Sequence, residues 1–577
     1  MKIFFFLTIM ANIAIADQMV DTSGYDVKLA EKLNAALKNY DLEFRLVDQN
    51  GSGVSLSDYA GKKELVITSI MPECDNEKIV KAAKKLSKNI IFLNPDASTD
   101  RDVQSAKFPD QTILMDENQQ VSLSLQFTNA GDYVVMDPGT QKIKKSGNFL
   151  DKKKEKSCKI PYVTYVPGQF YKEVIPALKN ACLNCHANTQ NLDYFQTLES
   201  VQSWKQMMLR TIRLRRMPPG ADPHYSHINS HSAKDVLIIT KWLESGAVIE
   251  GKMKENYERM IKARANYKPP VPKDRVIRPV VLFDLPPEKI SAGGSDFYKH
   301  YTTETPTTQD FYATSFFFDI NDNVAHHVAL HYSMKPFPKV DLKGRPIDEP
   351  GSMPLYGNNP ERITGTYKNK IIEGFKFQDP NIIHLSRTKG MQHSPRGTTY
   401  FIPKGSYLNL EIHYNPSGKD EESKNVLTIF HDESLKDRPK LKRFSMMPND
   451  GTVIAQPFEK DSVVTMTYKL KENIDLLGYG LHMHYRARSG KLYAQLPGEK
   501  KSKLIFSIPT YQYKLQVNSM LETPISLPKD TVITHEMHYD NSKENLSNPG
   551  PEKAVKIGIS ILNDENYLPR FYYVEKQ

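Results

Sequence analysis

The sequence predicts a multidomain chain with an α/β domain first, a small helical domain second and an all-β region last. Its 577 residues are too many for one hydrophobic core. Strands alternate with amphipathic helices in the first part. Three helical runs follow, of which the second is predicted as one helix over 200–220 and the third is predicted to end at Gly246. Short alternating strands separated by Gly, Pro and Asn turns fill the remainder. The hydrophobic content of 39% is typical of folded domains rather than of disordered chains.

Residues 1–16 have the pattern of a secretory signal peptide. Lys2 precedes an apolar run that ends in Ala14-Ile15-Ala16, a small-x-small cleavage site. The run is too short to span a bilayer, and no later apolar stretch is longer, so we expect no membrane span. We therefore expect a periplasmic or secreted protein.

The charge pattern argues against nucleic-acid binding. The formal net charge is +10, which is mild for this length, and Lys-rich runs such as 152–154 lie among acidic neighbours. A nucleic-acid site needs a clustered basic stripe, which the sequence lacks.

Residues 17–158 are predicted as the α/β domain. The strand ELVITSI leads into a turn with Cys74, then the helix DNEKIVKAAKKL and the strand NIIFLN. With LVDQNG, VSLSDYAGK and DYVVMDPGTQKIKKSG, residues 40–147 resemble the redoxin family, which implies a thioredoxin-like fold. Glu77 stands where a second cysteine of a CxxC motif would lie.

Cys74 and Cys158 are candidate redox residues. A thiol at a helix start has a lowered pKa, which permits thiol or peroxide chemistry. Apart from Cys182 and Cys185, Cys158 is the one possible partner, and a Cys74–Cys158 disulfide is open to a catalytic or a structural interpretation. The structural one is favoured, because nothing else in this segment supports a redox site.

Residues 159–251 are predicted as a helical domain that carries covalent haem c. Cys182, Cys185 and His186 form a CxxCH motif, in which two thiols attach haem and the histidine binds its iron. Met217 lies in RMPPG, which resembles the MPP pattern of small bacterial cytochrome c domains and implies the second axial ligand. The nearby histidines are minority alternatives for that ligand: His224, His227 and His231.

Residues 252–275 are charged and end in KPPVPK, which predicts a linker. Strand-like segments such as SYLNLEIHY, VVTMTYKL and TVITHEMHY then predict two all-β sandwiches, over 276–432 and 433–577. This region has no cysteine, so packing, with or without metal, must hold it together.

Three histidine motifs stand out in the β region. AHHV holds His326 and His327, EIHY holds His413, and LHMHY holds His482 and His484. Residues at i and i+2 of a strand share a face, so the last pair can chelate one ion. Imidazole-rich sites with few carboxylates suit copper or zinc.

In this order, the motifs over residues 275–577 resemble the type II copper, ascorbate-dependent monooxygenases. The resemblance implies two jelly rolls that face each other across a cleft. It implies a first, electron-storing copper on His326, His327 and His413. It also implies a second copper on His482 and His484, where the family binds oxygen and cleaves a C–H bond.

Two positions depart from the family. Its methionine ligand follows an Asp-Glu pair, and here Asn566 stands in that place. Four nearby residues are candidate replacements: Met483, Met537, His535 and His538. Alternation along TVITHEMHY puts His535 and Met537 on one face and Glu536 and His538 on the other. The peptide-amidating members hold a substrate carboxylate with an arginine where this chain has Gly480. Three other arginines are candidate anion anchors, with surface roles as the alternative: Arg486, Arg488 and Arg570.

The predicted function is a periplasmic copper monooxygenase-like oxidoreductase. It would use O2 to hydroxylate an unknown small molecule or peptide, with electrons from a periplasmic donor passing through the haem. One alternative is an electron-transfer or copper-handling protein with one intact copper. The other is a thiol or peroxide enzyme centred on Cys74.

Overall fold

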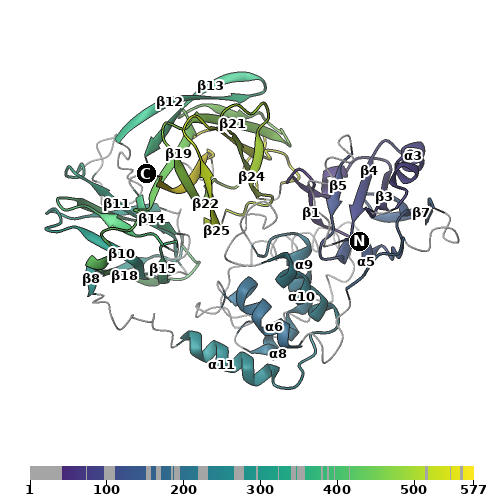
Figure 1. The fold of residues 1–577 in the computed structure, drawn as a ribbon, viewed down its shortest axis with the longest axis horizontal. Helices are drawn as coiled ribbons and strands as arrows, with labels where there is room; N and C mark the ends of the chain where they lie inside the picture. The colour runs from purple at the N-terminus through teal and green to yellow at the C-terminus, as the bar shows by residue number, and fades with distance from the viewer. Residues whose placement is uncertain are drawn as a thin grey trace. The chain divides into compact units, whose positions relative to one another are not determined.

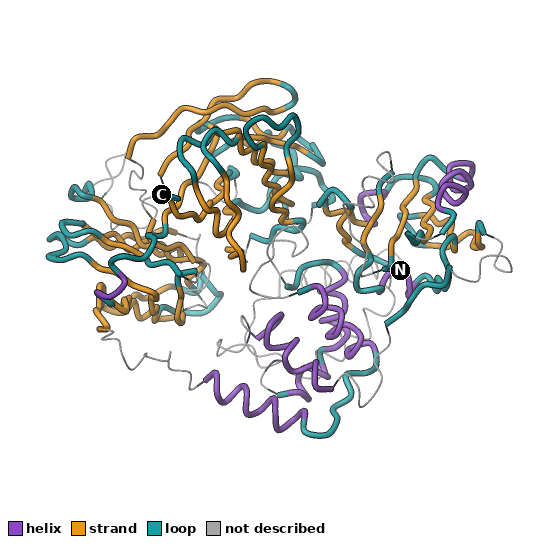
Figure 2. The backbone as a smooth tube through the Cα atoms, viewed as in Figure 1, coloured by secondary structure: helices purple, strands orange, loops and turns teal. Residues whose placement is uncertain are grey.

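The computed structural model describes most of the chain outside its N-terminal segment (Figures 1 and 2). The described residues are 42–72, 74–96, 111–150, 158–163, 171–183, 186, 195, 197–218, 232–265, 278–293, 297–321, 324–339, 346, 358–378, 381–385, 389–395, 397–414, 416–513, 518–545, 547–558 and 563–576. The predicted signal peptide, Cys185, His224, His227 and His231 lie outside them. The chain is β-rich and separates into two compact units, with the main boundary after residue 267.

The first unit begins with a seven-stranded sheet in the order β2-β1-β5-β4-β3-β6-β7. The β3–β4 and β4–β5 pairs are parallel and the others antiparallel. The elements are β1 (Arg45–Asp48), β2 (Gly53–Ser55), η1 (Leu56–Tyr59), β3 (Leu65–Ser69), α3 (Asn76–Leu86), β4 (Ile90–Asn94), β5 (Ile113–Met115), α5 (Gln120–Ser124), β6 (Asp132–Asp137) and β7 (Lys142–Asn148).

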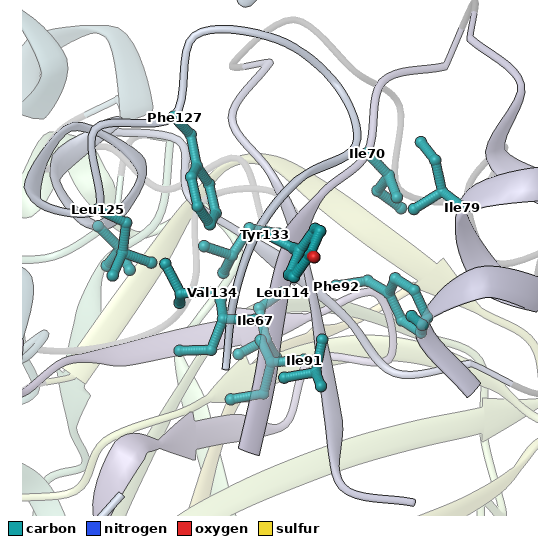
Figure 3. Packing of buried hydrophobic residues seen from close by; sticks show 14 of the residues in the cluster. Ile67, Ile70, Ile79, Ile91, Phe92, Leu114, Leu125, Phe127, Tyr133 and Val134 are labelled. Atoms are coloured by element: carbon teal, nitrogen blue, oxygen red, sulfur yellow. The ribbon is translucent and has the colours of Figure 1, made fainter. Parts of the chain in front are cut away.

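The core of this sheet follows from its strand sequences. Ile67, Ile91, Leu114 and Val134 pack together and are almost fully buried (Figure 3). Parallel strands covered on both faces need near-continuous apolar runs, which β3 and β4 provide. Helix α3 begins where the Asp75 side chain accepts a hydrogen bond from the Lys78 N–H. The predicted strands and helix here are confirmed.

Short helices form the second part of this unit: α6 (Tyr171–Leu178), the π-helical turn η2 (Lys179–Leu183), α8 (Leu198–Ser203), α9 (Lys205–Arg213), α10 (Ala233–Glu244) and α11 (Met253–Ala265). The run predicted as one helix over 200–220 is two helices that meet at Trp204. Helix α10 starts with a Ser232–Asp235 capping box. It stops before Gly246, whose φ of 97° confirms the predicted helix end.

The predicted linker over 252–275 is wrong for its first half. Helix α11 occupies Met253–Ala265, and Met253 and Tyr257 are fully buried in the helical core. The run is highly charged, but these two apolar side chains, four residues apart, lie on one helical face and anchor it.

The second unit begins with two antiparallel sheets that share one apolar core. One sheet has the order β15-β10-β18-β8 with β16 beside β10, and the other β14-β11-β17-β9. Phe316 and Ile429 of the first sheet and Leu330 and Ile412 of the second belong to the common core. The strands are β8 (Arg278–Ile290), β9 (Phe297–Thr302), β10 (Phe311–Asp319), β11 (Ala325–Ser333), β14 (Asn381–Leu385), β15 (Lys389–His393), β16 (Tyr400–Ile402), β17 (Tyr407–Tyr414) and β18 (Glu421–His431). We call this part the first β module.

The second β module contains a ten-stranded sheet in the order β24-β23-β26-β21-β12-β13-β19-β28-β22-β25, and a β20–β27 pair. Its strands are β12 (Asn358–Tyr367), β13 (Lys370–Gln378), β19 (Lys442–Pro448), β20 (Val453–Ala455), β21 (Ser462–Lys469), β22 (Ile474–His482), β23 (Ala487–Gln495), β24 (Lys503–Ile508), β25 (Asn518–Leu527), β26 (Val532–Tyr539), β27 (Val555–Lys556) and β28 (Leu568–Glu575).

The β12–β13 hairpin corrects the predicted division at residue 432. It lies within 276–432, but β12 pairs with β21 and β13 with β19, in the second module (Figure 1). Two glycines explain the fit. A Cβ on Gly365 would lie 2.6 Å from the Met466 sulfur, and one on Gly374 would lie 2.5 Å from its methyl carbon.

Candidate functional site

Strands β11 and β17 place His327 beside His413. The two residues are cross-strand partners, and their ring centres are 4.8 Å apart. The β11–β17 register shifts between Ala325 and His327, which is a bulge at His326. Tyr298, the partner of His413 on β9, stacks on the His413 ring at 4.0 Å. The predicted strand positions of both motifs are confirmed, and the side chain of His326 lies outside the described residues.

The second module contributes His482 and His484. Their ring centres are 5.8 Å apart, and the His482 ring contacts the His327 ring at 5.4 Å. The four side chains therefore form a continuous group, which we call the histidine cluster: His327, His413, His482 and His484. Their exposed fractions are 1%, 0%, 5% and 1%.

The two histidines of LHMHY do not share a strand face as predicted. Strand β22 ends at His482, and His484 lies in the turn that follows. A buried carboxylate shapes this turn, because Glu565 accepts hydrogen bonds from the backbone N–H groups of His484 (2.8 Å) and Arg486 (2.6 Å). Burial raises the pKa of Glu565 to about 7. Apart from the Asp-Glu pair, no local motif predicts this role of Glu565.

His327 offers a neutral imidazole at neutral pH. Burial lowers the pKa of His327 to about 4. Metal binding requires an unprotonated ring nitrogen, so this environment favours the binding form. A metal–nitrogen bond of about 2.0 Å sets the ring centres of two imidazoles on one ion about 4.5 to 6 Å apart. The His327–His413 and His482–His484 separations fall in this interval.

The imidazole donors suit copper in type. Within the described ranges, no three His, Cys, Asp or Glu side chains already converge as a metal-binding group. A third ligand beside His327 and His413 would come from His326.

The Asn566 side chain forms a hydrogen bond with its chain neighbour. Its side-chain oxygen accepts a hydrogen bond from the Tyr567 N–H at 2.8 Å. Three of the four candidate replacements for the methionine also have local side-chain partners. His535 contacts Tyr479 through Nε2 and Tyr567 through Nδ1, and His538 pairs with Asp461 and Glu536. The Met537 sulfur accepts from the Tyr539 hydroxyl, and Met483 is fully buried.

The arginine candidates separate into two kinds. Arg488 pairs with Asp540 at 2.7 Å, whereas Arg486 and Arg570 are 2% and 0% exposed, so surface roles for those two are wrong. Arg570 is the cross-strand partner of Gly480, and its charge disfavours protonation of His327. A Cβ on Gly480 would lie 2.3 Å from the Asn518 side-chain oxygen, which explains why no larger residue fits there.

The predicted haem residues lie in the helical part. Cys182 is half-buried in the π-helical turn that follows α6, and the His186 ring stacks on Phe195 at 4.6 Å. Tyr257 of α11 donates a hydrogen bond to the Phe195 backbone oxygen at 2.6 Å, so the helix predicted as linker supports this stack. Met217 is half-buried after α9. A thiol and an imidazole at the end of one helix fit covalent haem in residue type.

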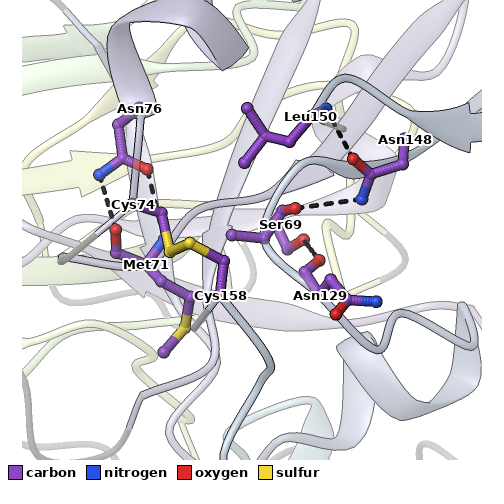
Figure 4. Close-up of a disulfide and its surroundings, with 9 residues drawn as sticks. Ser69, Met71, Cys74, Asn76, Asn129, Asn148, Leu150 and Cys158 are labelled. Atoms are coloured by element: carbon purple, nitrogen blue, oxygen red, sulfur yellow. Dashed lines mark hydrogen bonds between the residues drawn. A yellow bond between two sulfur atoms is a disulfide. The ribbon is translucent and has the colours of Figure 1, made fainter. Parts of the chain in front are cut away.

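Cys74 and Cys158 form a disulfide with Cα atoms 5.9 Å apart (Figure 4). The buried side-chain amide of Asn76 stabilises the Cys74 turn, because it donates a hydrogen bond to the Met71 backbone oxygen and accepts one from the Met71 N–H. Cys158 is 5% exposed, which suits a structural bond better than a thiol that must react with substrate.

Comparisons with known proteins assign no family. No family model and no curated protein match the chain. A hypothetical protein from Sinorhizobium meliloti 1021 is 16% identical, with 24% of this chain and 80% of that chain covered and a TM-score of 0.18. An uncharacterized conserved protein from Geobacillus kaustophilus is 18% identical, with coverages of 24% and 79% and a TM-score of 0.17.

A Paenibacillus xanthan lyase is 9% identical, with 52% of this chain and 25% of that chain covered and a TM-score of 0.12. Likenesses this weak define neither fold nor activity. Among the described helices, none is both long and apolar enough to cross a membrane.

Proposed function

We propose that this chain is an exported, copper-dependent monooxygenase-like oxidoreductase that uses O2 to hydroxylate an unknown small molecule or peptide. The observation that carries the proposal is the histidine cluster, in which buried imidazoles from two β modules lie in contact. Buried polar rings cost stability unless hydrogen bonds or a ligand satisfy them, and a copper site would do so for this group of rings.

In this proposal, His326, His327 and His413 hold one copper, and His482 and His484 hold a second. Copper supplies the one-electron chemistry with oxygen, while the chain binds, orients and excludes water. The low exposure of the cluster supports water exclusion. Arg570 adds positive charge near His327.

The finer assignments of the other parts belong to the same proposal. The first sheet is a thioredoxin-like domain whose disulfide is structural. The helical part is a cytochrome c domain, with haem on Cys182, Cys185 and His186 and with Met217 as second axial ligand. The β modules are jelly rolls of the copper monooxygenase type, and a periplasmic donor supplies electrons through the haem.

A second candidate is an electron-transfer or copper-handling protein with one copper. The local engagement of the Asn566 amide favours it, because the second copper would then lack the family's third ligand. A thiol enzyme centred on Cys74 is disfavoured by the buried partner Cys158.

The full chain is loaded with copper and haem, reduced without air and then mixed with O2. Oxygen uptake and haem reoxidation, followed together, separate these candidates. The oxygenase predicts haem reoxidation that slows at least about 100-fold in His482→Ala, since a copper ligand is lost. His538→Gln is the matched control, because it removes a histidine of the same module that pairs with Asp461 and Glu536 instead. Equal uptake in wild type and His482→Ala would instead favour the electron-transfer candidate.

A further inference from the structure

A buried carboxylate lies among three imidazoles next to the histidine cluster. Glu411 on β17 has one oxygen 3.5 Å from Nε2 of His327. Its other oxygen is 3.5 Å from Nε2 of His331 and 3.9 Å from Nδ1 of His300. The four residues are at most 7% exposed.

Strand register brings these groups together on one face. Glu411 is two residues from His413, and its cross-strand partners are Ala329 on β11 and His300 on β9. Leu410 and Ile412, its chain neighbours, point into the apolar core on the opposite face. The carboxylate is therefore fixed by the sheet at the level of His327 and His413.

Burying the negative charge of a carboxylate in a protein interior costs free energy unless nearby groups compensate it. An ionised carboxylate out of water needs hydrogen-bond donors and positive charge nearby. The Nε2 atoms of His327 and His331 each lie 3.5 Å from one of the Glu411 oxygens, and a cation bound at His327 would add positive charge beside it. The arrangement carboxylate–imidazole–metal is one in which the carboxylate orients the ring and raises its basicity.

We propose that Glu411 is a positioning residue of the copper site formed by His327 and His413, and that His331 and His300 hold its carboxylate in place. The inference rests on the proposed function in one respect, namely that copper binds at His327 and His413. Glu411 keeps a proton on Nε2 of His327, so that the other ring nitrogen is the one offered to the ion. Its negative charge favours the doubly charged ion over the singly charged one.

The test compares Glu411→Gln with wild type in the haem-loaded full chain. The glutamine keeps the size of the side chain and removes the charge. Copper affinity of the first site is expected to fall about 10- to 100-fold. The copper reduction potential, from a redox titration of the spin-resonance signal, is expected to rise.

Glu433→Gln is the matched control. Glu433 also faces a histidine, with Oε2 3.6 Å from Nε2 of His431, but it is 70% exposed and outside the cluster. Its replacement is expected to change neither affinity nor potential. A Glu411→Gln protein that binds copper with the affinity and potential of wild type would overturn the inference while leaving the proposed function intact. Failure of wild type to bind copper would overturn both.

Two further measurements do not depend on how Glu411→Gln folds. His331→Asn loosens the carboxylate but leaves it beside His327, so the potential is expected to rise by less than in Glu411→Gln. In metal-free wild type, nitrogen NMR of labelled histidine is expected to find the His327 proton on Nε2. The proton on Nδ1 of His327 would contradict the inference even if copper binds.

Discussion

Replacing Cys158 by alanine is expected to lower the free energy of unfolding of the first sheet by about 4 kcal/mol, because the disulfide restricts the unfolded chain. The bond joins residues separated by 84 positions, and long closed loops gain the most from such a link. Hydrogen exchange of the β3 and β4 amides in the full chain measures this change.

The double variant with Cys74→Ala is the control. Both substitutions break the same bond, so the double variant is expected to cost no more than the single one. The backbone pairing of the segment should survive, since Ala130 and Ile160 bond to the oxygens of Cys158 and Thr128. Wild-type protection in Cys158→Ala would show that the bond is not structural and would revive the thiol candidate.

Acid is expected to destabilise the second β module through His535. Burial lowers the pKa of His535 to about 3, whereas the unfolded side chain titrates near 6.5. Between these values the unfolded state binds a proton that the folded state does not. Stability therefore falls as pH falls through this window, by about 1.4 kcal/mol per pH unit.

Replacing His535 by glutamine removes this proton while leaving a partner for the Tyr479 and Tyr567 hydroxyls. From pH 6.5 to 4.5, the variant is expected to lose about 2.5 kcal/mol less stability than wild type. The measurement is urea unfolding of both proteins at each pH, monitored through hydrogen exchange of the β26 amides.

His538→Gln is the control on the same strand. Burial disfavours the charged form of His538, but its hydrogen bonds to Asp461 and Glu536 outweigh this and raise its pKa. Its loss is therefore not expected to reduce the acid sensitivity. Equal pH dependence in wild type and His535→Gln would rule out His535 as the acid-sensitive group.

Local patterns in the sequence predicted individual elements well. Alternation in TVITHEMHY predicted that His535 and Met537 share one face and Glu536 and His538 the other, and the burial of β26 confirms it. The Cys74 turn, helix α3 and the end of α10 at Gly246 were predicted for the same reason, since caps, turns and periodicity are short-range signals.

Features that depend on residues far apart in the chain could not be predicted from the sequence. The β12–β13 hairpin joins a sheet whose other strands begin about 65 residues later, with β19. Helix α11 was mistaken for a linker because its charges outnumber its two anchoring side chains. Glu411 and Glu565 gain their roles from residues on other strands, so neither shows in a local motif.

Copper bound per chain, counted against haem iron in the exported full chain, tests the central claim most directly. The account predicts two coppers in wild type, with one lost in His413→Ala and one in His482→Ala. His431→Gln, which replaces a histidine of the first module that accepts from the Tyr312 N–H, should retain both. Copper content that is the same in His413→Ala, His482→Ala and His431→Gln would contradict the histidine cluster as a copper site.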